Sequence, residues 1–225
     1  MPSPLTSETE AISRALAFTG FDQLDGVTIS AKRLALTENP VPFVGRALVG
    51  QEVWQVTLAN VRLKLPSAVS SFKDRYVRTF TVLLRASTGQ LVAIHSQPDG
   101  PARPLRPEPS ADSAESQLAG EDETYEALPD RLPKVHLLDG LDHVLNDGIG
   151  SPLVAQEINA VYVVHSRMGS APLAVWAITL RGIPPLPARG PAAESVPVWQ
   201  RDHIRNVLDA ESGKVLFAKN SPQPD

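Results

Sequence analysis

The chain has 225 residues, of which 42% are hydrophobic, so it is long enough for one or two small domains with a substantial core. Its formal net charge of −4 gives no global electrostatic support for nucleic-acid binding. The absence of cysteine excludes disulfides, thiolate metal ligands and a cysteine nucleophile.

The N-terminal sequence and the hydropathy pattern bear on localisation. Residues 1–10 lack the basic start and the apolar run of a signal peptide. No stretch approaches the ~20 consecutive apolar residues that a membrane span needs. We therefore expect a cytoplasmic protein without a membrane span, or an extracytoplasmic one if a leader was removed from this sequence.

The first half of the chain opens with a well-marked helix. Ser7 and Glu10 have the spacing of a capping box, and apolar residues at helical spacing follow until Gly20. Alternating apolar and polar residues then predict strands, because a half-buried strand is apolar on one face. These strand patterns cover residues 27–36, 52–65 and a hairpin over 76–95.

The segment 99–130 has a different composition from the rest of the chain. It holds nine acidic residues against Arg103 and Arg106, together with five prolines and few large apolar side chains. Such a segment cannot bury enough apolar surface to offset the ordering entropy of ~1–2 kcal/mol per residue. The composition therefore predicts an acidic flexible linker.

The second half repeats the order of the first. A helix is expected over residues 133–147, and Ser151 followed by a proline predicts the start of a further short helix. Strand patterns follow at residues 160–166, 173–180 and 203–218, the last being a hairpin.

One strand occurs twice, nearly letter for letter, as Val53-Trp-Gln-Val-Thr-Leu58 and Val175-Trp-Ala-Ile-Thr-Leu180. The two copies are 122 positions apart (175 minus 53), and the hairpin glycines Gly89 and Gly213 are 124 apart (213 minus 89). We interpret this as an internal duplication. Each tryptophan lies inside an apolar strand, which favours a largely buried core anchor over a ligand-stacking residue.

The predicted fold is α+β, with two tandem repeats, each a helix packed on a small antiparallel β-sheet, joined by an acidic, proline-rich linker. The first repeat covers residues 1–98, the linker residues 99–130 and the second repeat residues 131–225. The sequence leaves open whether the repeats form separate domains or one larger sheet.

The closing hairpin Asp209-Ala-Glu-Ser-Gly-Lys-Val-Leu216 resembles that of PepSY-type domains, in which a D-x-x-[TS]-G turn joins the last two strands. The first-half segment Arg85-Ala-Ser-Thr-Gly-Gln-Leu-Val92 is similar, with Arg85 where the family favours aspartate. The resemblance implies a helix on an antiparallel sheet and a role in peptidase regulation or interaction. It carries no catalytic motif, and it gives Asp209 and Gly213 the role of turn formers.

One helix face is a candidate for metal binding. His136, Asp139 and His143 recur at helical spacing, and Asp147 follows a turn later. Imidazole and carboxylate groups on one face can hold a divalent metal, but a solvated polar face has the same pattern. We expect neither a metal nor a cofactor.

Two pairs of basic residues near strand ends could bind an anionic ligand if they meet across a sheet. They are His165 with Arg167 and His203 with Arg205, and surface polarity explains them equally well. The segment Gly148-Ile-Gly150 precedes the predicted short helix and could hold an anion, but it reads equally as a turn. None of the phosphate-loop, serine-hydrolase or zinc-protease motifs is present.

The sequence therefore favours a non-catalytic binding or protein-interaction module, with a regulatory role of the PepSY kind as one form of it. We expect a protein partner or self-association, and no nucleic acid. The alternative is an enzyme or a small-ligand-binding protein that uses a cleft between the two repeats. A purely structural subunit is a third possibility.

Overall fold

The structure, a computed structural model, describes residues 4–37, 49–68, 77–99, 123–126, 131–148, 150–167, 171–183 and 203–220. Within them the first half forms helix α1 (Glu8–Thr19) and strands β1 (Thr28–Ala35), β2 (Glu52–Arg62), β3 (Val77–Arg85) and β4 (Leu91–Pro98). The second half forms β5 (Glu123–Glu126), α3 (Leu137–Asp147), β6 (Glu157–Arg167), β7 (Leu173–Arg181), β8 (His203–Asp209) and β9 (Val215–Asn220).

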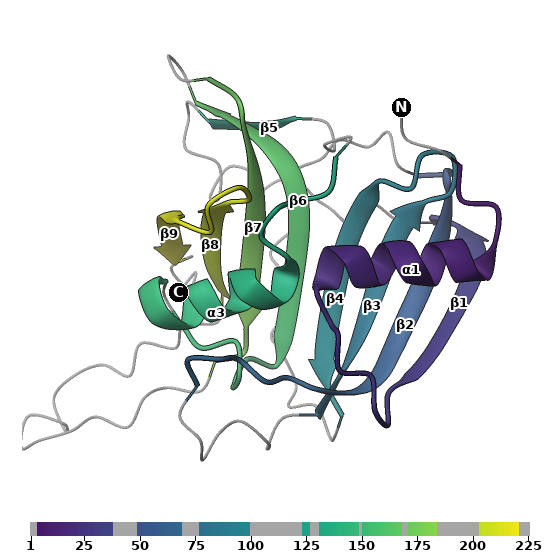
Figure 1. The fold of residues 1–225 in the computed structure, drawn as a ribbon. Coiled ribbons are helices and arrows are strands. Elements are labelled where there is room, and N and C mark those ends of the chain that lie inside the picture. The colour runs from purple at the N-terminus through teal and green to yellow at the C-terminus, as the bar shows by residue number, and fades with distance from the viewer. Residues whose placement is uncertain are drawn as a thin grey trace, which may run out of the picture.

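The described strands form one antiparallel sheet with the order β1-β2-β3-β4-β6-β7-β8-β9, and β5 pairs with β6 beside this path. The expected fold class, with a separate small sheet in each repeat, is therefore wrong. The two halves are joined because β4 pairs directly with β6, with Ile94 opposite Ala160 and His95 opposite Asn159. The fold is dominated by this sheet, and only two helices are described (Figure 1).

Both helices lie on the same face of the sheet, with α1 across the first-half strands and α3 across the second-half strands (Figure 1). Helix α1 begins with the predicted capping box of Ser7 and Glu10 and ends at Gly20, which has a left-handed backbone. The main core lies between the helices and the sheet and contains residues of both halves. Phe18 of α1, for example, packs against Tyr162 of β6, with ring centroids 6.2 Å apart.

The repeated tryptophans make the same hydrogen bond in both halves. Trp54 donates its indole N–H to the Leu5 carbonyl at 3.1 Å, and Trp176 donates to the Val135 carbonyl at 2.7 Å. Each acceptor precedes a helix, so each tryptophan fixes the chain that leads into α1 or α3. Trp176 is fully buried, as predicted, because its cross-strand neighbour is Tyr162. Trp54 is only partly buried because it lies beside the outermost strand, β1.

Some element boundaries differ from those predicted. Helix α3 begins four residues later than expected, at Leu137, with His136 as its N-cap residue. The residues after Ser151 form a turn instead of a helix. Within the predicted linker, residues 123–126 form β5, and residues 100–122 and 127–130 lie outside the described part of the chain.

Candidate functional site: a polar row on the sheet face opposite the helices

A row of polar residues crosses the sheet from one edge to the other. Each strand contributes one polar residue, and this residue lies directly opposite the polar residue of the neighbouring strand. The row consists of Ser30, Thr57, Thr81, His95, Asn159, Thr179, Arg205 and Lys219. It contains hydroxyl, imidazole, amide and cationic groups and no carboxylate, and we call it the polar row.

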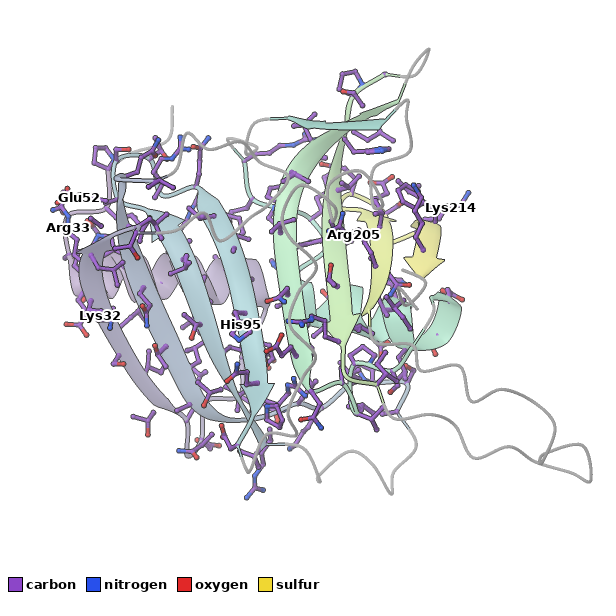
Figure 2. All side chains as sticks on the ribbon, turned by 180° about the vertical axis from the view of Figure 1, so that it is seen from behind. Lys32, Arg33, Glu52, His95, Arg205 and Lys214 are labelled. Atoms are coloured by element: carbon purple, nitrogen blue, oxygen red, sulfur yellow. The ribbon has the colours of Figure 1, made fainter. Side chains whose placement is uncertain are left out.

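The polar row lies on the sheet face opposite the helices. Side chains alternate between the two faces along a strand, so the neighbours of a row residue point the other way. These neighbours, such as Val82, Ile94 and Ile178, belong to the core beneath the helices. Figure 2 shows the sheet from this side, with His95 on β4 and Arg205 on β8.

The centre of the row lies where the two halves of the chain meet. His95 of β4 and Asn159 of β6 are cross-strand neighbours, and the His95 Nδ1 and Asn159 Oδ1 atoms are 2.6 Å apart. An amide oxygen only accepts hydrogen bonds, so Nδ1 donates and Nε2 is the acceptor of the neutral ring. Both side chains are half-buried, and Thr81 and Thr179 flank them. The pairing of β4 with β6 thus brings together two polar side chains from different halves of the chain.

The row is most buried at Thr179 and Arg205, and it is cationic at Arg205 and Lys219. The Arg205 side chain is 2% exposed, and its Nε donates to the Thr179 hydroxyl at 3.4 Å. The Lys219 ammonium lies 5.1 Å from the centre of the Phe217 ring, which is within the range of a cation–π contact. The row therefore carries neutral hydrogen-bonding groups from Ser30 to Thr179 and cationic groups at Arg205 and Lys219.

The polar row lies between two different regions of the same sheet face. On one side lies a second cluster of buried apolar residues, which includes Val161, Val163, Val175, Ala177 and Val207. On the other side the Arg181 guanidinium forms an ion pair with Glu157 at 2.7 Å, with side-chain exposures of 13% and 15%. This face of the sheet is consequently amphipathic.

The four basic residues proposed as an anion site are not brought together. His165 lies opposite Leu173 and Arg205 opposite Thr179, six positions apart on β7. Their backbones are thus ~20 Å apart along the strand. His165 is buried, and its ring centroid is 5.7 Å from that of Phe217. Arg167 and His203 occupy the ends of β6 and β8, and their side chains lie outside the described part of the structure.

The three residues of the candidate metal face lie in three different environments. The His136 ring bonds through Nδ1 to the Ala17 carbonyl of α1 at 2.9 Å, whereas the His143 ring lies against Gly213. Asp139 is exposed to solvent. Within the described residues no three His, Asp or Glu side chains form a group that could hold a metal ion.

Sequence reasoning did not identify the polar row, apart from Arg205. One signal was available, because Thr57 and Thr179 are the shared threonines of the two Val-Trp-x-x-Thr-Leu strands. A polar residue at the same position of both copies marks the strand face that lies away from the helices. His95 and Asn159 carry no comparable signal, because their proximity depends on the β4–β6 pairing.

Comparison with protein-family models, curated proteins and solved structures finds no match to this chain. Neither of the helices in the described residues combines the length and hydropathy that crossing a bilayer requires.

Proposed function

We propose that this protein is a non-catalytic binding module that holds a partner protein on the sheet face carrying the polar row. The observation that carries the proposal is the row itself, which crosses all eight strands of the sheet path without an apolar residue. A sheet face that serves only as core carries apolar side chains. The row instead offers donors and acceptors in a line across the sheet.

The chemistry of the row suits a protein partner. Serine, threonine, asparagine and histidine can each both donate and accept, so together they can satisfy backbone and side-chain groups of a partner. Small molecules prefer concave, mostly apolar pockets, whereas the half-buried members of the row, such as Thr57, Thr81 and His95, extend across several neighbouring strands, as the residues of a protein interface do. The resemblance of the Asp209–Gly213 hairpin to PepSY-type domains favours the same class, including a regulatory role.

The residue types of the row support a non-catalytic role. Acid–base and nucleophilic catalysis need a base oriented and activated by a neighbouring group, which is commonly a carboxylate. The polar row holds one imidazole and no carboxylate, and its closest polar contact, to Asn159, is neutral. The His95 ring is thus positioned for hydrogen bonding to a partner.

One observation favours a second candidate, a small-ligand-binding protein with its site between the halves. His95 and Asn159 come from different halves and meet on the sheet face. A small polar ligand would be recognised there by Nε2 of His95 and the hydroxyls of Thr81 and Thr179. Calorimetric titration with a partner protein and with a library of small polar metabolites distinguishes the two candidates.

The test is capture of a partner from extracts of the native host by the immobilised full chain, quantified by mass spectrometry. Thr81→Arg places a large side chain in the row, and Lys64→Ala changes an exposed residue elsewhere as the matched control. We expect a partner that wild type and Lys64→Ala bind equally and that Thr81→Arg loses at least ~10-fold, which is ~1.4 kcal/mol. A partner retained by folded Thr81→Arg, or no captured partner at all, contradicts the proposal.

A further inference from the structure

Among the described strands, the path of the sheet ends at two edge strands, β1 and β9, while β5 pairs with β6 beside this path. In the described structure β1 pairs with β2 alone and β9 pairs with β8 alone, and the two strands lie at opposite ends of the sheet (Figure 1). An edge strand presents a row of backbone donors and acceptors to which another strand can add. The two edges differ in how they are protected.

Strand β9 corresponds to the internal strand β4. Both follow a hairpin turn closed by a glycine N–H, with Gly89 donating to the Arg85 carbonyl and Gly213 to the Asp209 carbonyl. Both also carry an irregularity in register at the same place, where one extra residue is inserted. The registers therefore match Val92, Ala93 and Ile94 of β4 with Leu216, Phe217 and Ala218 of β9.

The corresponding residues are apolar in both strands but are buried only in β4. Val92, Ala93 and Ile94 are 0%, 8% and 1% exposed, and β4 is covered at its outer edge by β6. Leu216 is 37% exposed, one of the most exposed large apolar side chains in the described residues, and Phe217 is only partly buried. Strand β9 thus has the apolar character of the covered strand β4, but among the described strands it pairs with β8 alone.

Strand β1 is protected in a different way. The Ala31 N–H donates to the Glu8 carboxylate of α1 at 3.2 Å, so a side chain already occupies a backbone donor of this edge. Arg33 forms an ion pair with Glu52, and the neighbouring Lys32 is exposed (Figure 2). Charged side chains on an edge strand oppose the addition of another strand. The β1 edge is therefore a poor acceptor for β9 of another molecule, and head-to-tail growth of the sheet is disfavoured.

We propose that two copies of this chain associate through β9, paired antiparallel about a twofold axis that passes near Ala218. This isologous arrangement uses only the β9 edge and closes on itself, as most homodimers do. In this register Phe217 of each copy lies opposite Lys219 of the other (217 plus 219 equals twice 218), which extends the existing Lys219–Phe217 contact across the interface. Because one short strand gives a small interface, the dimer is weak, with a Kd of about 1–100 μM.

Sedimentation of the full chain across a concentration series tests the proposal. Wild type should pass from monomer to dimer. Ala218→Pro should raise the Kd at least ~10-fold, because proline has no N–H and its ring obstructs strand addition. The matched control is Ala31→Pro on the β1 edge, which should dimerise like wild type. Thr81→Arg, which should lose partner binding at the polar row, should dimerise like wild type. The two proposals can therefore fail independently of each other.

Single cysteines provide a second readout, because the chain has no cysteine of its own. Ala218→Cys should form a disulfide-linked dimer under mild oxidation, since paired residues near a twofold axis lie ~4.5–5.5 Å apart between Cα atoms. Ser30→Cys on β1 should not. A wild type that stays monomeric throughout, open-ended larger oligomers, or cross-linking through Ser30→Cys with none through Ala218→Cys would each overturn the proposal.

Discussion

At the scale of single residues, Arg78 is a buried charged side chain that links the two halves. It is 1% exposed and donates from Nε to the Ser96 hydroxyl at 2.9 Å and from Nη1 to the Ala155 carbonyl at 2.8 Å. Burial lowers the pKa of Arg78 to about 10, an effect that Asp99 partly offsets, so the side chain keeps its charge at neutral pH. Its hydrogen bonds replace the water that a buried cation loses.

Replacing Arg78 by methionine should lower the free energy of unfolding by on the order of 3 kcal/mol. Methionine keeps much of the apolar volume but leaves the buried Ala155 carbonyl and Ser96 hydroxyl without their donor. Urea denaturation measures the effect. The matched control Arg62→Met, at an exposed position of β2, should change stability by less than ~0.5 kcal/mol. Equal effects of the two substitutions would show that the buried hydrogen bonds contribute little.

At the scale of elements, the C-terminal end of α1 packs in close contact with the N-terminal end of α3. Gly20, the C-cap residue of α1, has a φ of +74°, and a Cβ atom there would lie 2.7 Å from Cβ of His136. The His136 ring donates to the Ala17 carbonyl at the same place. His136 is thus held in a contact between the helices, which gives it a packing role in the described structure.

The substitution Gly20→Ala should destabilise the protein by about 2–5 kcal/mol, combining left-handed backbone strain with overpacking against His136. Gly26 is the matched control, because its φ is +78° and a Cβ atom there would meet nothing within 4 Å. Gly26→Ala should therefore cost only the backbone strain of about 1–2 kcal/mol. Thermal unfolding of both variants measures the difference, and a Gly20→Ala variant no less stable than Gly26→Ala would contradict the close contact.

The elements also show what could be predicted from the sequence. Alternation along each strand reveals which residues share a face, and it located the repeated strands and both hairpins. It contains no information on which strand lies beside which, so the β4–β6 pairing and the joined sheet were missed. His95 and Asn159, 64 positions apart in sequence, become neighbours only through that pairing. The strand β5 was missed because its surroundings are acidic and proline-rich.

At the scale of the whole molecule, the two halves share one sheet and one core. The core beneath the helices includes Phe80 and Leu84 of the first half together with Tyr162 and Trp176 of the second. The Tyr162 ring packs against Phe18 of α1, and its centroid lies 5.5 Å from that of Trp176. Since both halves contribute to the same cluster, neither can expose its part of the core without the other.

The described part of the chain should therefore unfold in a single cooperative transition, even though its elements repeat. Trp176→Ala should lower the stability measured by that transition by about 3–5 kcal/mol, because the ring is fully buried and its removal leaves a cavity. Trp54→Ala should lower the same transition by a smaller amount, because Trp54 is only partly buried at the edge of the core. Calorimetry together with urea denaturation followed by circular dichroism measures both effects. Two separate transitions, each shifted by only one of the variants, would show that the halves unfold independently despite the shared sheet.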